Sequence, residues 1–171
     1  MEFEDIDFTE FHNTLNEYCE VVKEKYKDRL ISDDKFATGE LIQSINTVIK
    51  TGVTNITVYI NLAEHWKYVE FGRKPGGKFP PPDKIEAWIV AKPVIPYEDD
   101  NGKLPTQKQL AFLIGRKIAR DGIKPGNYLH DTLEECNNIY LEKLKDALQK
   151  DFDTFSIKIL REVNKSLKKW C

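Results

Sequence analysis

The feature that most constrains the fold is a helical repeat at the C-terminal end of the chain. Apolar or aromatic residues follow one another from Leu129 to Trp170 in steps of three or four. Eleven steps cover 41 residues, a mean of about 3.7, which is close to the α-helical period and wider than the roughly 3.5 of a left-handed coiled coil. One straight helix of this length would extend roughly 60 Å. We therefore expect either two helices separated at residues 151–153 or one helix whose end docks on another chain.

A second constraint is a stretch of broken backbone in the middle of the chain, HWKYVEFGRKPGGKFPPP at residues 65–82. Its glycines and first proline prevent regular helix, and three consecutive prolines delay the next helix to Asp83. Aromatic side chains precede the loop, and cations stand on it. A loop of this kind suits contact with another molecule, so we expect an interface that includes Trp66, Tyr68, Phe71, Arg73, Lys74, Lys78 and Phe79.

Residues 72–78 also fit the spacing G-x-x-x-x-G-K of phosphate-binding loops. In nucleotide hydrolases a Ser or Thr follows the lysine and holds magnesium, and the first N–H groups of a helix face the phosphates. Here Phe79 takes the place of the hydroxyl residue, and three prolines occupy the donor positions. The loop is therefore not predicted to bind a nucleotide.

Apolar residues at helical spacing predict several shorter helices before the long repeat. They are expected, in chain order, at residues 8–31, 37–45, 62–71 (a turn or short helix), 83–91 and 105–121. The predicted N-caps of the first and fourth are Thr9 and Asp83, and Gly122 is expected to close the last. The side chains predicted to face inward are Leu41, Ile42 and Ile45, then Ile85, Trp88 and Ile89, then Leu110, Phe112, Leu113, Ile114 and Ile118.

The clearest β pattern lies at about residues 47–61, where β-branched residues alternate on both sides of a glycine-containing turn. This pattern predicts a hairpin. A hairpin alone is only marginally stable, so we expect it to join a larger sheet or to pair with a neighbouring subunit. The predicted fold class is α+β, with helices packed on a small antiparallel sheet. Residues 1–135 would form this domain, including its N-terminal helix, and residues 136–171 a C-terminal helical extension.

Charge is distributed unevenly along a chain whose formal net charge is −2. Residues 1–62 carry 12 acids and 6 bases, and residues 63–126 carry 8 acids and 12 bases. An acidic first third beside a basic middle suits head-to-tail contact between copies of the chain. Ordinary solubility charge explains the pattern equally well.

Residues that could perform catalysis are scattered. His12, His65 and His130 lack metal-ligand spacing, and Glu64, His65 and Glu70 have no nucleophile or oxyanion group near them in sequence. The three cysteines form no C-x-x-C motif, which indicates neither a disulfide framework nor a zinc site and fits a reducing compartment. We expect no enzyme activity and no catalytic, cofactor-binding or metal-binding residues.

One alternative remains open on the residues alone. The aromatics before the loop could stack on bases beside its cations, and the carboxylates of a nuclease leave weak local signatures. A nucleic-acid-interacting protein that uses the basic loop from Arg73 to Lys78 is this alternative. No membrane span or signal peptide is expected, because apolar runs are short and MEFEDIDF is acidic.

Three segments together resemble the tail-completion, or head–tail joining, proteins of tailed bacteriophages. They are ATGELIQSI followed by ITVYI, then YVEFGRKPGGKFPPPDKIEAWI, then LAFLIGRKIARDGIKPGNYLHDTL. In that family an aromatic pair and E-F-G precede a basic Gly/Pro loop, and an apolar–basic helix ends in G-I-x-P before an aromatic-led last helix. The matching residues here are Tyr68, Glu70, Phe71, Gly72, Pro75, Pro80, Pro81 and Pro82, then Ala111–Ala119, then Gly122, Ile123, Pro125 and Tyr128.

The resemblance implies a structural virion protein, made in the bacterial host cytoplasm, that forms a ring in the neck or tail. The ring would contain about six or twelve copies and join the portal or adaptor side to the tail proteins. DNA would pass through its lumen without sequence-specific contacts, and no membrane is involved. The basic loop would reach a neighbouring subunit or the tail tube, and the C-terminal helix would clasp an adjacent ring through Phe155, Ile159 and Trp170.

Overall fold

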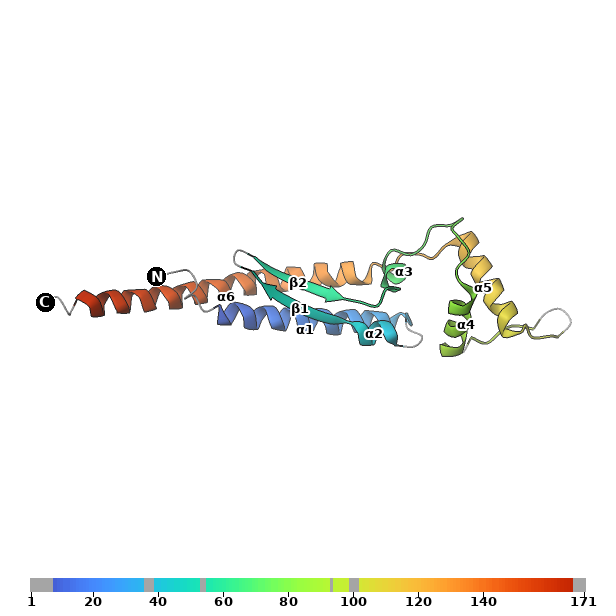
Figure 1. The fold of residues 1–171 in the computed structure, drawn as a ribbon, viewed down its shortest axis with the longest axis horizontal. Coiled ribbons are helices and arrows are strands. Elements are labelled where there is room, and N and C mark those ends of the chain that lie inside the picture. Colours follow the sequence, from blue (N-terminus) through green and yellow to red (C-terminus); the bar gives the residue numbers. More distant parts are fainter. Residues whose placement is uncertain (1–7, 36–38, 53–54, 93, 99–101, 168–171) are drawn as a thin grey trace. The chain divides into compact units, whose positions relative to one another are not determined.

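The computed structural model describes residues 8–35, 39–52, 55–92, 94–98 and 102–167. In chain order, its elements are α1 (Thr9–Ser32), α2 (Glu40–Ser44), β1 (Asn46–Thr51), β2 (Ile56–Asn61), α3 (Trp66–Glu70), α4 (Pro82–Ala91), α5 (Gln107–Asp121) and α6 (Tyr128–Leu167) (Figure 1). The predicted α+β class is confirmed, since helices accompany one small antiparallel sheet and a long helix follows. Within the described residues, every helix is too short or too polar to cross a membrane.

Contacts divide the chain into two compact units. One joins the residues up to Glu24 with those from Thr132 onward, and the other spans Lys25–Asp131. This division differs from the predicted one, which placed the whole N-terminal helix in the main domain and drew the boundary after residue 135. The difference arises because the first half of α1 packs on α6.

The first unit is built from these two helices. Its buried apolar side chains recur at helical spacing on both of them and are Leu15, Cys19 and Val22 on α1 and Cys136, Tyr140 and Ala147 on α6. At its edge the Tyr140 hydroxyl donates a hydrogen bond to Glu17 (2.7 Å). The Tyr18 hydroxyl donates one to Asn137 (2.8 Å).

α6 runs unbroken over 40 residues, so the alternative of a break at residues 151–153 is wrong. Asp151 is only 4% exposed, and its carboxylate accepts hydrogen bonds from the N–H groups of Glu10 (3.1 Å) and Phe11 (2.8 Å). These N–H groups, in the first turn of α1, have no partner within their own helix. Asp151 thus caps α1 from another helix. Thr9, the predicted N-cap, is instead the first helical residue.

The second unit has its main core where the end of α1, α2, α3 and the start of α6 meet. Its buried members are Tyr26, Leu30, Leu41 and Ile45, and the half-buried side chains against them are Ile42, Leu62, Ala63, Trp66, Val69, Tyr128 and Leu129. The inward residues predicted for the second helix are therefore correct. The predicted start of that helix near residue 37 lies outside the described residues.

β1 and β2 pair antiparallel, with Asn46 opposite Asn61 and Thr51 opposite Ile56. This confirms the hairpin predicted at about residues 47–61. In the part of the chain that the structure describes, the sheet has two strands, so the expected wider sheet does not form there. Pairing with a neighbouring subunit stays a prediction.

α4 and α5 share a smaller core of Ile85, Ile89 and Ala111. α4 begins with Pro82 at its first helical position, so Asp83 lies inside the first turn and is not the N-cap. α5 begins with a capping box between Thr106 and Gln109, and Gly122 ends it as predicted, at a φ of 75°.

Three aromatic or aliphatic side chains predicted to face inward in α4 and α5 are exposed instead, namely Trp88, Phe112 and Leu113. The buried side of α5 centres on small residues, Ala111 and Gly115. A Cβ added to Gly115 would lie 2.5 Å from a ring carbon of Phe79. The absence of a side chain at Gly115 lets the loop pack there, which turns the larger residues of α5 outward.

Candidate functional site

The Gly/Pro loop after α3 lies backbone to backbone against the segment between α5 and α6. The Arg73 N–H donates to the carbonyl of Ile123 (2.8 Å), and the Ile123 N–H donates to the carbonyl of Arg73 (2.9 Å), forming an antiparallel bridge. The Gly76 N–H donates to the carbonyl of Ala119 near the end of α5 (2.8 Å). The start of the loop is therefore held on α5 and does not project from the fold.

Two glycines make this close approach possible. Gly72 and Gly122 have φ values of 64° and 75°, in the left-handed region that disfavours other residues. A Cβ on Gly72 would lie 2.2 Å from the carbonyl oxygen of Ile123, and one on Gly122 would lie 2.2 Å from that of Arg73. Each glycine thus leaves the space that the backbone of the opposite segment occupies. We call this paired arrangement, Gly72–Arg73 against Gly122–Ile123, the clasp.

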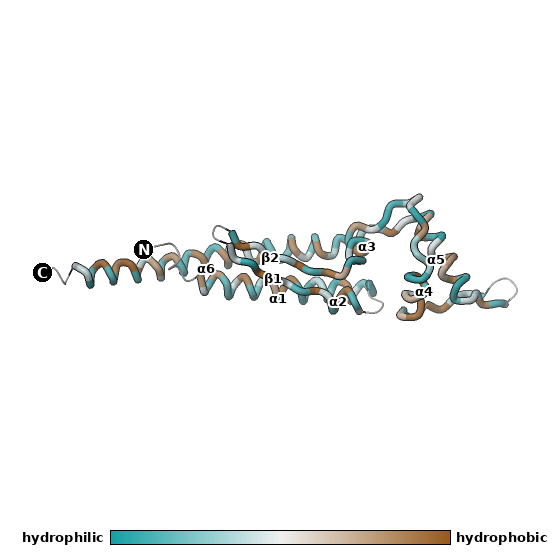
Figure 2. Tube along the Cα trace, in the orientation of Figure 1, coloured by the Kyte–Doolittle hydropathy of each residue, from teal (hydrophilic) through white to brown (hydrophobic). Residues whose placement is uncertain are grey.

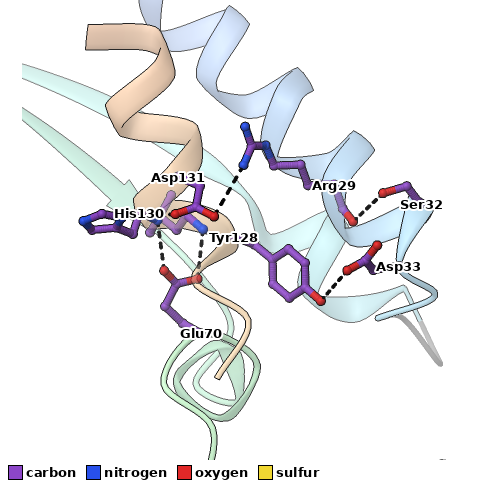
Figure 3. A network of polar contacts seen from close by, with 8 residues as sticks. Arg29, Ser32, Asp33, Glu70, Tyr128, His130 and Asp131 are labelled. Atoms are coloured by element: carbon purple, nitrogen blue, oxygen red, sulfur yellow. Dashed lines mark hydrogen bonds and ion pairs between the residues drawn. The ribbon is translucent and has the colours of Figure 1, made fainter. Parts of the chain in front are cut away.

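Glu70, the acid of the E-F-G motif, completes the clasp by capping α6 (Figure 3). Its carboxylate accepts hydrogen bonds from the N–H groups of Leu129 (2.8 Å) and His130 (2.9 Å), in the first turn of a helix that lies 59 residues or more further along the chain. Its own carbonyl accepts from the N–H groups of Gly126 and Asn127. The side chain is 2% exposed. A buried carboxylate at a helix N-terminus is stabilised by these charge-assisted bonds and by the helix dipole.

Two tyrosines pack around this acid. Burial raises the pKa of Tyr26, and the nearby negative charge of Glu70 raises it further. Burial, followed by the hydrogen bond to Asp33 and the charges of Asp33 and Glu70, raises the pKa of Tyr128 to about 12. The Tyr128 hydroxyl donates to Asp33 at 2.8 Å. Both phenols are therefore neutral at physiological pH.

The structure brings together some of the residues predicted at an interface. Trp66 is half-buried in the main core, and the centroid of its ring lies 5.4 Å from the ring centroid of the exposed Phe71. Tyr68 is exposed on α3. The Arg73 guanidinium donates a hydrogen bond to the carbonyl of Lys78 across the loop.

The remaining predicted interface residues differ in setting. Lys74 and Lys78 are exposed on the loop. Phe155 and Ile159 are half-buried on α6, in the other compact unit, and Trp170 lies outside the described residues. The predicted set is thus two separate groups of side chains, one in each unit.

Phe79 reveals a surface that the sequence pattern missed. Its ring stacks on that of Phe112, with centroids 5.6 Å apart. Phe79, Phe112 and the neighbouring Leu113 remain 40%, 55% and 52% exposed. Exposed cations flank these three side chains in sequence and along α5, and we call the whole surface the aromatic–basic face: Lys78, Phe79, Lys108, Phe112, Leu113 and Arg116.

The residues named in the sequence as a possible acid–base group, Glu64, His65 and Glu70, lie in different settings. Both carboxylate oxygens of Glu70 accept hydrogen bonds from backbone N–H groups. Glu64 and His65 are exposed and lie just before α3. Among the described residues, His130, Asp131 and Glu134 could offer one metal ligand each, with their ligand atoms within 4.8 Å of one another. All three are exposed, and the Asp131 carboxylate also lies 3.8 Å from the guanidinium of Arg29. The prediction that His130 lacks metal-ligand spacing is therefore wrong, because Glu134 lies one helical turn further along α6.

No family model matches this chain, and neither a curated protein nor a solved structure matches it.

Proposed function

We propose that this chain is a structural virion protein of a tailed bacteriophage that forms a ring in the neck or tail. It would join the portal side to the tail around the DNA channel, as a head–tail connector or tail-completion protein. In this proposal it performs no catalytic step. It is made in the host cytoplasm and ends in the particle.

The observation that carries the proposal is the structural use of the motif residues. Glu70, Gly72 and Gly122, through which the sequence resembles the tail-completion family, hold two distant segments together in the clasp. An enzyme motif would place reactive groups around a site that a substrate can reach. Motif residues used as scaffold support a protein whose function lies in its shape and contacts.

Exposed apolar surface on α6 supports assembly with other chains. The start of α1 contacts Asp151 of α6. α6 extends beyond the start of α1, and hydrophobic residues recur along this extension (Figure 2). The large apolar side chains that are exposed there are Phe152, Ile157, Leu160 and Val163. Apolar surface of this kind on a monomer commonly marks an interaction site. The proposed partners are other copies of the chain, in a ring of about six or twelve, and the portal or adaptor and tail proteins.

A nucleic-acid-interacting protein, including a nuclease, has less support. Arg73 is committed to the carbonyl of Lys78, and Glu70 is committed to α6. Lys74 and Lys78 remain as exposed cations of the loop, and two lysines supply little affinity for a phosphate backbone. In the proposed ring these lysines face DNA or a neighbouring subunit without reading sequence.

Native mass spectrometry of the purified protein, followed by electron cryo-microscopy of virions from the same host, tests the proposal. We expect a closed oligomer in the spectrum and a ring of this chain between capsid and tail. A protein that is monomeric at every concentration and absent from purified particles would contradict it. Charge reversal at Lys74 and Lys78 tests the nucleic-acid alternative. If this variant loses salt-dependent DNA binding but still assembles, a nucleic-acid role is favoured.

A further inference from the structure

The aromatic–basic face combines exposed apolar side chains with exposed cations. The stacked rings of Phe79 and Phe112, with Leu113, form an exposed apolar platform. Lys108 and Arg116 stand one helical turn on either side of Phe112 along α5, and Lys78 adjoins Phe79. Within the described residues, the structure records no ion pair for these three cations. A binding partner for this face needs apolar side chains and carboxylates close together.

A segment of the same chain has that composition. Residues 2–7 read EFEDID, with four carboxylates, the apolar residues Phe3 and Ile6, and no base. These residues precede α1 and lie outside the described residues. Their four negative charges complement the three cations of the face, and Phe3 and Ile6 match its exposed rings in kind.

We infer that residues 2–7 of one copy bind the aromatic–basic face of a second copy. The inference rests on the proposed ring, because a head-to-tail contact of one segment with a different surface on the next copy generates a ring when the rotation closes. Phe3 and Ile6 cover Phe112 and Leu113, while the carboxylates pair with the cations around them. Opposite charges at the rim speed association and fix which surfaces meet, and the apolar centre supplies affinity.

The first test measures the contact without the ring. The receptor is the full chain with its own segment reversed in charge (Glu4→Lys, Asp5→Lys, Asp7→Lys), and the probe is a fluorescein-labelled peptide MEFEDIDF. We expect saturable binding by fluorescence anisotropy. Adding Lys108→Glu and Arg116→Glu to the receptor should weaken binding at least about tenfold. Adding Lys158→Glu and Arg161→Glu, exposed cations on α6, is the charge-matched control and should leave it unchanged.

A second peptide separates specific binding from simple attraction of charges. A peptide with Phe3→Ser and Ile6→Ser keeps all four carboxylates, and it should bind at least about tenfold more weakly. Equal binding of both peptides, or equal binding to the Lys108→Glu/Arg116→Glu receptor, would overturn the inference. Circular dichroism of each receptor verifies that the exposed substitutions leave the fold intact.

The third measurement asks whether the segment docks on a different copy. A chain with the reversed segment and a chain with the reversed face should each lose the oligomer seen for the natural sequence by native mass spectrometry. Mixing the two should restore it, because each reversed surface then meets its complement on the other chain. Restoration only when both reversals are combined in one chain would show docking within a single copy, and would overturn the inference.

These outcomes separate the inference from the proposed function. If the natural chain forms a ring and is found in virions, but the peptide does not bind, the ring stands and the inference fails. If the peptide binds as expected, but the protein is absent from particles, the contact stands and the virion role fails.

Discussion

Two buried carboxylates, Glu70 and Asp151, perform the same task in different parts of the molecule. Each accepts two hydrogen bonds from N–H groups in the first turn of a helix that is distant in sequence. A buried charge is costly unless it is compensated, and here backbone donors and the helix dipole compensate it. Sequence spacing cannot reveal such caps, because N-cap rules consider only the residues that immediately precede a helix.

Replacing Glu70 by Gln should destabilise the protein by about 1–3 kcal/mol. The amide keeps one acceptor but places an NH₂ group against the second backbone donor and removes the charge that the helix dipole favours. Urea unfolding followed by circular dichroism measures the change. Glu64→Gln, on an exposed residue of the same turn region, is the control and should stay within about 0.5 kcal/mol. Equal effects of the two variants would refute the capping role.

Alkaline pH should destabilise the fold through its buried and half-buried tyrosines, which include Tyr26, and two of them can be tested together. The hydrogen bond to Glu17 and burial raise the pKa of Tyr140 to about 12, and burial with Asp33 raises that of Tyr128 to about 12, against 10.0 for an ordinary tyrosine. The folded state therefore holds protons that the unfolded state has released. The stabilisation is fully present below pH 10 and is lost as the pH rises through about 12.

Urea unfolding at pH 9 and pH 11 tests this sign. The free energy of unfolding of the natural chain should fall between these two values, and a Tyr128→Phe/Tyr140→Phe variant should show a smaller fall. Tyr97→Phe is the control, since that side chain is 93% exposed, and its pH dependence should match the natural chain. A double variant with the natural slope would assign the alkaline sensitivity to other groups.

At the scale of elements, the sequence predicted what depends on local pattern. The hairpin was predictable because β-branched residues alternate around its turn, and the end of α5 because Gly122 follows its last apolar residue. The exposure of Phe112 and Leu113 was not predictable, because it depends on the packing of Phe79, from a loop distant in sequence, against Gly115. Whether α6 is broken at residues 151–153 stayed open on the sequence alone, because Asp151 disfavours a helix interior by propensity, and its bonds to the start of α1 could not be foreseen.

The candidate site divides in the same way. The motif residues were predicted to matter, and the aromatics and cations around the loop were named. Their contact with another molecule stays a prediction, but the sequence did not reveal that backbone hydrogen bonds from Arg73 and Gly76 fix the loop's first half on its neighbours. Backbone hydrogen bonds leave no pattern of side chains in the sequence. The glycines on both sides of the clasp could therefore be read from the sequence, but their close approach could not.

Substituting alanine for Gly72 should disrupt the clasp. The new Cβ would lie 2.2 Å from the Ile123 carbonyl oxygen, whereas a Cβ on Gly76 would meet nothing within 4 Å. Both glycines have positive φ, 64° and 72°, so the two alanine variants share the same backbone penalty of about 1 kcal/mol. We expect Gly72→Ala to unfold at least about 1–3 kcal/mol more easily than Gly76→Ala in urea. Equal free energies of unfolding for the two alanine variants would show that the contact of Gly72 with the Ile123 segment does not stabilise the fold.

At the scale of the whole molecule, two structural units serve different ends in the proposed assembly. The unit that contains the clasp presents the aromatic–basic face. The unit of α1 and α6 presents the apolar end of α6, which includes Phe155 and Ile159. Both surfaces keep large apolar side chains exposed, Phe112 and Leu113 on one and Leu160 on the other. Both are therefore available to other chains in the ring that we propose.

Replacing Phe155 and Ile159 by serine should weaken assembly while leaving the isolated fold intact. These half-buried side chains lie beyond the cap at Asp151, so their loss should change the free energy of unfolding of the dissociated chain by no more than about 1 kcal/mol. Native mass spectrometry should show smaller species than the natural chain forms. Lys158→Ser, exposed in the same turn, is the control and should assemble normally. Unchanged assembly of the double serine variant would remove the end of α6 from the contact.

The capping of α1 by Asp151 also sets an order of events during synthesis. The donors at Glu10 and Phe11 leave the ribosome early, and their acceptor follows only after a further 140 residues. Until then the first helix has an open end, while Glu70 is already in place when the start of α6 emerges. During synthesis the unit of residues 25–131 is therefore complete before the start of α1 can be capped. A ribosome that stops before residue 151 would release a product whose opening helix frays.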